Sequence, residues 1–142
     1  MGLSMLGGYA ATYLKVLRIL EGEKLAKISA VVIRSPEKYP REVEYFRSKS
    51  VPIYGSFDEM IEAERDRIEI VALPTAIHQH KEMTVKALKS GFNVIVEEPP
   101  AVTVQDLDEM IEAERESGRF CAVGFQLQSK TVVRRIKESI CG

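Results

Sequence analysis

The sequence has few cysteines, no long apolar run and no excess of charge of one sign. Its 142 residues contain two cysteines, Cys121 and Cys141, which are too few for a disulfide framework. We interpret Cys121 as a packing residue within an apolar stretch and Cys141 as a loose thiol. No run approaches the ~20 apolar residues that cross a bilayer, and no signal-peptide charge pattern is present. We therefore expect a protein of the reducing cytoplasm that does not bind membranes.

The balance of charges disfavours one class of partner. Lys and Arg number 20 and Asp and Glu number 21, so the net charge is −1. A protein that neutralises phosphates needs a basic surplus, and nucleic acid is therefore not expected as the main partner. An apolar content of 45% and a charged content of 29% are typical of a globular domain. The length is enough for one such domain to bury its own core.

Short apolar runs alternate along the chain with segments whose apolar residues recur three and four positions apart. The predicted strands are residues 3–6, 27–33, 51–54, 68–73, 93–96 and 120–125, and a last helix is predicted over residues 131–140. Apolar strands that alternate with helices are typical of a parallel sheet covered on both faces. We predict a doubly wound α/β sheet, the Rossmann fold, with six strands in the order 3-2-1-4-5-6.

Helix boundaries are marked by capping residues. Ser56 with Glu59, and Thr103 with Asp106, have the spacing with which a side chain accepts a bond from a free backbone N–H. Pro40 suits the first position of a helix, since a proline there gives up no required hydrogen bond. Three glycines follow helical segments, where a left-handed residue is commonly needed: Gly22, Gly91 and Gly118.

The octapeptide DEMIEAER occurs twice, at residues 58–65 and 108–115. Two equivalent helices of a layered fold need similar amphipathic patterns, and these residue types are good helix formers. We interpret the repeat as structural and assign it no function.

The turn after the first predicted strand reads LGGYA at residues 6–10. In a dinucleotide fingerprint, Gly7 would let the backbone approach the pyrophosphate, and Ala10 would let the helix pack closely on the strand. Met5 occupies the remaining glycine position and fits it poorly. Free N–H groups at the start of the next helix attract phosphate, although a plain tight turn explains the two glycines as well. The candidate cofactor-binding residues here are Gly7, Gly8, Tyr9 and Ala10.

The end of the second predicted strand indicates which dinucleotide would bind. Domains that prefer NAD carry an acidic residue there for the ribose hydroxyls, whereas this chain has Ile33 followed by Arg34, Ser35 and Lys38. An arginine can bind a 2′-phosphate with two hydrogen bonds. We therefore expect NADP rather than NAD, with Arg34, Ser35 and Lys38 as candidates. The alternative is that these are solvated charges of a turn.

After the fourth predicted strand, Leu73, Pro74 and Thr75 would pass beneath the dinucleotide at the carboxyl edge of the sheet. His78 either donates a hydrogen bond there or caps the next helix. With His80 it also forms a His-x-His pair. We predict no metal site, because neither a cysteine nor a third clustered ligand accompanies the pair.

Residues 93–100 read NVIVEEPP, and together with the other motifs they resemble the glucose–fructose oxidoreductase/inositol dehydrogenase/MocA (Gfo/Idh/MocA) family of sugar and polyol oxidoreductases. Glu97 and Pro99 match the family's Glu-Lys-Pro, and Pro74 with His78 matches its Thr-Pro-x-x-x-His. The glycine turn, the SPEK segment at 35–38 and the strand ending at residues 123–126 occur in the same order. The resemblance covers nearly the whole chain and implies an NAD(P)-dependent oxidoreductase.

The chain departs from this family at catalytic positions. Leu73 replaces the family's threonine, and Tyr13 stands where the family often has histidine. Glu98 replaces the lysine that lies beside the nicotinamide. An ionised Glu98 would oppose the charge of a developing alkoxide, whereas a buried, protonated Glu98 beside Glu97 would act as a general acid or base. Both interpretations remain open, and Glu97, Glu98 and Pro99 are candidates for cofactor binding only.

The resemblance also implies a second α/β domain that holds the substrate pocket. We expect residues 1–142 to be a single dinucleotide-binding domain without that second domain. Hydride transfer needs water exclusion and substrate orientation, so we do not expect the chain alone to be a complete enzyme. Apolar surface left uncovered is expected to favour homo-oligomers. The alternative function is a non-enzymatic module with this fold that senses nucleotides or binds another protein.

Overall fold

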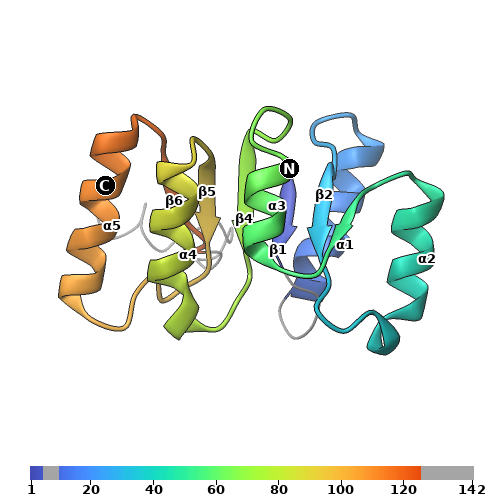
Figure 1. The fold of residues 1–142 in the computed structure, drawn as a ribbon, viewed down its shortest axis with the longest axis horizontal. Coiled ribbons are helices and arrows are strands. Elements are labelled where there is room, and N and C mark those ends of the chain that lie inside the picture. Colours follow the sequence, from blue (N-terminus) through green and yellow to red (C-terminus); the bar gives the residue numbers. More distant parts are fainter. Residues whose placement is uncertain (5–9, 126–142) are drawn as a thin grey trace, which may run out of the picture.

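The computed structural model describes residues 1–4 and 10–125, and within them the predicted sheet is confirmed (Figure 1). All strand pairs are parallel, and the order is β3-β2-β1-β4-β5-β6. The strands are β1 (Gly2–Ser4), β2 (Ala30–Val32), β3 (Ile53–Tyr54), β4 (Ile70–Leu73), β5 (Asn93–Val96) and β6 (Cys121–Val123). The predicted strands are longer because apolar runs continue past the residues that pair. The predicted helix over 131–140 lies outside the described residues.

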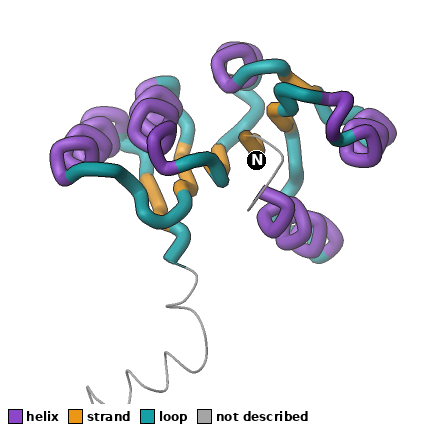
Figure 2. Tube along the Cα trace, turned by 90° about the horizontal axis from the view of Figure 1, so that it is seen from below, coloured by secondary structure: helices purple, strands orange, loops and turns teal. Residues whose placement is uncertain are grey.

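Helices cover the two faces of the sheet, with α1 on the opposite side from α3, α4 and α5 (Figure 2). The helical elements are α1 (Ala10–Gly22), the 3₁₀ turn η1 (Pro36–Lys38), α2 (Pro40–Ser48), α3 (Phe57–Ala63), α4 (Ile77–Lys89) and α5 (Val104–Ser117). Leu14 of α1 and Phe46 of α2 pack in one core cluster, and Met60, Leu88 and Met110 pack in the other. This is the layered arrangement that two-sided apolar strands predict.

Most predicted helix boundaries are confirmed. The Oγ atoms of Ser56 and Thr103 accept bonds from the backbone N–H groups of Glu59 and Asp106, at 3.2 and 3.1 Å. Pro40 begins α2. Gly91 and Gly118 have positive φ, at 91° and 63°.

The prediction for Gly22 is wrong. Gly22 is the last residue of α1, and the left-handed residue is Lys24, with φ 61°. The cause is one further helical bond, from the Glu23 N–H to the Ile19 carbonyl (3.0 Å), which carries the turn past the glycine.

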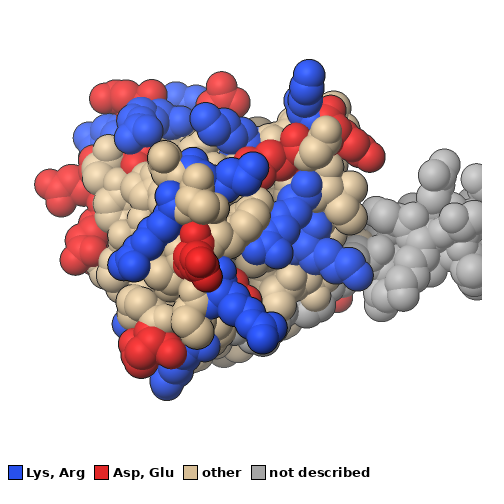
Figure 3. Space-filling view, turned by 90° about the vertical axis from the view of Figure 1, so that its right-hand side faces the viewer, with Lys and Arg blue, Asp and Glu red and all other residues tan. Residues whose placement is uncertain are grey.

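Charges of both signs share the surface on the side of α2, where Lys and Arg lie among Asp and Glu (Figure 3). Within α2, Glu42 and Glu44 lie between Arg41 and Arg47. The fields of neighbouring charges of opposite sign partly cancel at a distance.

Large apolar side chains remain exposed beside the edge strand β6. Phe120 is 46% exposed and Phe125 is 43% exposed. The expectation that uncovered apolar surface favours homo-oligomers stays a prediction.

A buried carboxylate links the β3 edge of the sheet to α3. Glu64 is fully buried just beyond α3, and its Oε1 accepts a 2.6 Å hydrogen bond from the Tyr54 hydroxyl. Arg67 approaches the same oxygen at 3.5 Å. Desolvation of Tyr54 and, second, this bond to Glu64 raise the pKa of Tyr54 to about 12. The phenol is therefore held in its neutral, donating form.

This contact predicts a loss of stability in alkali. The folded-state pKa of Tyr54 lies above its ordinary value near 10, so its contribution is complete below about pH 10 and disappears as the pH rises through about 12. Tyr54→Phe is expected to lower the free energy of unfolding by about 1–3 kcal/mol at pH 8, because Glu64 loses its closest donor. Urea denaturation at pH 8 and 11 should show a smaller alkaline loss in Tyr54→Phe than in the wild type. Tyr39→Phe is the matched control, and an equal loss in Tyr54→Phe and wild type would contradict the prediction.

Candidate functional site

The candidate site lies at the carboxyl edge of the sheet. All six strands run the same way, so the segments that follow β2, β4 and β5 emerge at this one edge. The chain order reverses between β1 and β4, which are neighbours in the sheet. In open α/β sheets, ligands bind outside the carboxyl ends of the strands at such a switch point.

The predicted pyrophosphate turn is only partly described. Gly7, Gly8 and Tyr9 lie outside the described residues, while Ala10 begins α1 and is fully buried. The first turn of α1 carries no acidic side chain that would repel a phosphate. The start of α1 therefore has the small residue that the fingerprint requires and no acidic side chain to repel a phosphate.

A pocket of about 230 Å³ lies beside Arg34, between β2, α3 and α4. Arg34 and Lys38 are exposed after β2, and Ser35 is half-buried as the N-cap of η1. The pocket is lined by Val32, Arg34, Ser56, Phe57, Asp58, Gln79, Glu82, Met83 and Lys86.

Both apolar and charged groups line this pocket. Phe57 and Met83 pack against the buried core, so they form an apolar wall. Lys86 adds a second cation, with its Nζ 2.7 Å from Asp58 Oδ1. Asp58 and Glu82 line the same pocket, so two carboxylates accompany its two cations.

The turn after β4 offers a hydroxyl to the edge. Leu73 and Pro74 are buried, and Thr75 is half-buried. The Oγ1 atom of Thr75 is buried but has no hydrogen-bond partner among the residues that the structure describes. Since a buried hydroxyl without a partner is unfavourable, a polar ligand at this edge would stabilise it. His78 is exposed on the first turn of α4 and lines a groove of about 390 Å³ between α4 and α5.

The sequence analysis missed the role of His80. This side chain is 1% exposed, and its Nδ1 and Nε2 atoms lie 2.9 Å from the Pro99 carbonyl oxygen and 3.0 Å from the Thr75 carbonyl oxygen. Within residues 1–4 and 10–125, no group of three or more side chains is placed to hold a metal ion. Helical periodicity was the signal available, because His80, Thr84 and Leu88 follow one apolar stripe of α4.

The segment after β5 has one buried and one exposed carboxylate. Glu97 is 7% exposed, whereas Glu98 is exposed and is joined to Pro99 by a cis peptide bond. The structure thus contradicts the interpretation that Glu98 is the buried acid of the pair. A Cβ atom added to Gly124 would lie 3.0 Å from Glu97 Oε1 and 3.2 Å from the Tyr13 hydroxyl. The ends of β5 and β6 and the start of α1 therefore converge around the Glu97 carboxylate.

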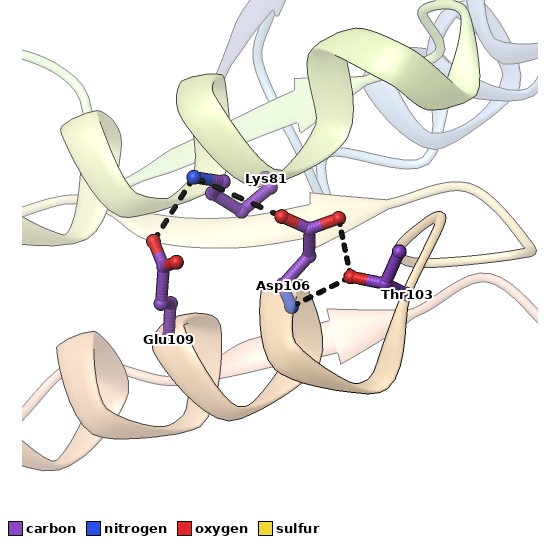
Figure 4. A network of polar contacts seen from close by, with 4 residues as sticks. All are labelled: Lys81, Thr103, Asp106 and Glu109. Carbon is purple, nitrogen blue, oxygen red and sulfur yellow. Dashed lines mark hydrogen bonds and ion pairs between the residues drawn. The ribbon is translucent and has the colours of Figure 1, made fainter.

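Lys81 links α4 to α5 on the outer side of the site (Figure 4). Its Nζ lies 3.0 Å from Glu109 Oε2 and 3.8 Å from Asp106 Oδ1, and Thr103 donates to Asp106 at 2.8 Å. The hydrogen bond to Glu109 and the nearby carboxylates raise the pKa of Lys81. Lys81 is therefore a cation that holds the two helices together, and it does not act as a base.

Residues 3–125 match the family described as "Oxidoreductase family, NAD-binding Rossmann fold". The chain belongs to the Gfo/Idh/MocA family. The match includes all six strands of the sheet from Leu3 onward, as well as the carboxyl edge described above.

Two curated members of the Gfo/Idh/MocA family are similar over half of the chain. The 1,5-anhydro-D-fructose reductase of Ensifer adhaerens is 30% identical over 73 residues, which are 51% of this chain and 22% of that protein. The 2,7-anhydro-N-acetylneuraminate hydratase of Mediterraneibacter gnavus is 36% identical over 76 residues, which are 54% of this chain and 20% of that protein. The matched segment spans about a fifth of either relative.

A solved structure confirms the fold of this Gfo/Idh/MocA chain. The WlbA dehydrogenase from Bordetella pertussis, in complex with NADH and UDP-GlcNAcA, superposes with a TM-score of 0.84 at 18% identity. The superposition covers 98% of this chain and 40% of that one. Among the helices of residues 10–125, none is long and apolar enough to span a membrane.

Proposed function

We propose that this chain is the dinucleotide-binding domain of a Gfo/Idh/MocA-type oxidoreductase and that it binds NADP(H) in preference to NAD(H). The observation that carries the preference is the end of β2. Ile33, where NAD-preferring domains have a carboxylate, is 2% exposed, and the exposed Arg34 borders a pocket that also contains Lys86. An arginine directly after the strand, in place of a carboxylate, favours a 2′-phosphate over ribose hydroxyls alone.

The proposal gives each part of the carboxyl edge a role. The start of α1 would bind the pyrophosphate, the turn after β2 the ribose phosphate, and the segments after β4 and β5 the nicotinamide end. The Thr75 hydroxyl, which is buried without a hydrogen-bond partner among the described residues, would gain one from such a ligand. The residues proposed for this site are Gly7, Gly8, Tyr9, Ala10, Arg34, Ser35, Lys38, Leu73, Pro74, Thr75, His78, Glu97, Glu98 and Pro99.

Catalysis by these 142 residues is a separate question. A bound nicotinamide supplies a hydride acceptor or donor, and the protein must stabilise the charge that develops on the substrate oxygen. The exposed Glu98 is a carboxylate where the family resemblance expects a lysine, so it opposes that charge. This residue favours a second candidate function, a nucleotide-binding module without dehydrogenase activity. We propose that the chain by itself binds the dinucleotide and does not oxidise sugars or polyols.

Calorimetric titration with NADPH and NADH tests the cofactor preference. We expect NADPH to bind at least tenfold more tightly than NADH, and Arg34→Ala to remove this difference by weakening NADPH alone. Arg47→Ala, in the last turn of α2, is the matched control and should preserve the preference. Equal affinities for NADPH and NADH in the wild type would contradict the preference, and binding of neither would contradict the proposed function.

A further inference from the structure

His80 is the buried point at which two turns of the carboxyl edge meet. It lies one turn into α4, and its imidazole reaches the carbonyl oxygen of Thr75 in the turn before α4 and that of Pro99 in the segment after β5. Both N···O distances, 3.0 and 2.9 Å, are those of ordinary hydrogen bonds. Because β4 and β5 are neighbours in the sheet, the two turns lie side by side and His80 joins them.

The two partners of His80 are both pure acceptors. A carbonyl oxygen has no proton to donate, and a neutral imidazole has only one N–H. With a neutral ring, one nitrogen lone pair would therefore face a carbonyl lone pair at about hydrogen-bond distance. Only the imidazolium donates to both oxygens, and a bond from a charged donor is the stronger kind.

We propose that His80 is a positioning residue of the dinucleotide site: its imidazolium joins the turn after β4 to the segment after β5, and so makes dinucleotide binding depend on pH. This inference rests on the proposed function, because both joined segments belong to the proposed cofactor edge. When the ring loses one proton, one hydrogen bond becomes a repulsive contact. Thr75 and Pro99 then lose their common support, and the edge is no longer preorganised for the ligand.

The elements that meet at His80 carry both carboxylates and ammonium groups. Glu97, only 7% exposed, belongs to the same segment as Pro99. The turn before α4 contributes no titratable side chain, and the Lys81 ammonium is turned to carboxylates of α5. Besides His80, α4 carries His78, Lys81, Glu82, Lys86 and Lys89, the segment after β5 carries Glu97 and Glu98, and Asp106 and Glu109 of α5 pair with Lys81.

NMR of the ring nitrogens tests the protonation state directly. The chain has two histidines, so His78→Gln assigns both sets of signals without ambiguity. We expect one-bond N–H couplings at both Nδ1 and Nε2 of His80 in the folded chain at about pH 6.5. A single N–H coupling at that pH would overturn the proposal. This measurement needs neither a substitution of His80 nor a cofactor.

The second test is the affinity for NADH between about pH 6 and pH 8, the range in which histidine changes its charge. NADH is the probe because it lacks the 2′-phosphate, whose own protonation falls in the same range. We expect binding to weaken about tenfold in the wild type as the pH rises. His80→Gln, which cannot titrate, should bind with an affinity independent of pH.

Two results would overturn the link to binding. One is the same pH dependence in His80→Gln as in the wild type, and the other is no pH dependence in either. Failure of the proposed function is recognised separately: neither NADH nor NADPH would bind at any pH, while the NMR couplings would still report the state of the ring. Circular dichroism at each pH confirms that His80→Gln remains folded.

Discussion

Replacing Phe92 with alanine is expected to lower the free energy of unfolding by about 3–5 kcal/mol. Phe92 is fully buried between the end of α4 and the start of β5, in the core cluster that also contains Leu88 and Val94. Removing its ring takes apolar area from the core and leaves a cavity that the packed strands cannot fill. A domain is stabilised by about 5–15 kcal/mol in total, so this one change removes a large share.

Urea denaturation followed by circular dichroism measures the effect of Phe92→Ala. Phe120→Ala is the matched control, because the same side chain is removed from a site that is 46% exposed. We expect the control to lose less than about 1 kcal/mol. Equal losses in the two variants would mean that the cluster around Phe92 is not packed as described.

Arg34→Asp is expected to reverse the cofactor preference. The new carboxylate would repel the 2′-phosphate of NADPH and accept hydrogen bonds from the ribose hydroxyls of NADH. We expect the affinity for NADPH to fall about 100-fold, which corresponds to about 2.7 kcal/mol, while that for NADH stays equal or increases. Because Arg34 is exposed, the substitution should not disturb the core.

Calorimetry with both dinucleotides checks this reversal. Arg47→Asp makes the same charge change on α2, away from the pocket beside Arg34, and should leave the preference for NADPH intact. A loss of less than threefold in NADPH affinity for Arg34→Asp would show that the 2′-phosphate lies elsewhere. An equal loss for both variants would indicate a general effect of net charge.

The sheet could be predicted from the sequence because apolar runs identify buried strands directly. Their exact ends could not, since pairing with a neighbour decides where a strand begins. The second predicted strand starts at Lys27, yet pairing with β1 starts at Ala30, opposite Gly2. The prediction that Gly22 is left-handed failed for a related reason, because one further helical hydrogen bond moved the left-handed residue to Lys24.

The two copies of DEMIEAER show the limit of local sequence most directly. The first copy ends its helix at Ala63, while the second continues to Ser117. Glu64 is buried and accepts a hydrogen bond from the Tyr54 hydroxyl. The equivalent Glu114 accepts a hydrogen bond from the Cys121 N–H at 2.8 Å. Identical octapeptides therefore form helices of different length because their tertiary partners differ.

For the candidate residues, the sequence could predict the position along the backbone but not the burial of each side chain. Arg34, Thr75 and Glu97 follow strands β2, β4 and β5, so a parallel topology brings them to one edge of the sheet. Burial was assigned less well, because it depends on contacts between distant segments. The sequence pattern drew attention to His78, but the buried histidine that bridges two turns is His80.

The shortness of β3 has a consequence for how the protein behaves at high concentration. This edge strand has two residues, Ile53 and Tyr54, and Pro52 directly before it has no N–H to donate. A strand of a second chain would therefore meet very few unpaired backbone N–H and C=O groups at this edge of the sheet. Strand-by-strand polymerisation is thereby discouraged at the β3 edge, even though the sheet itself is parallel and apolar.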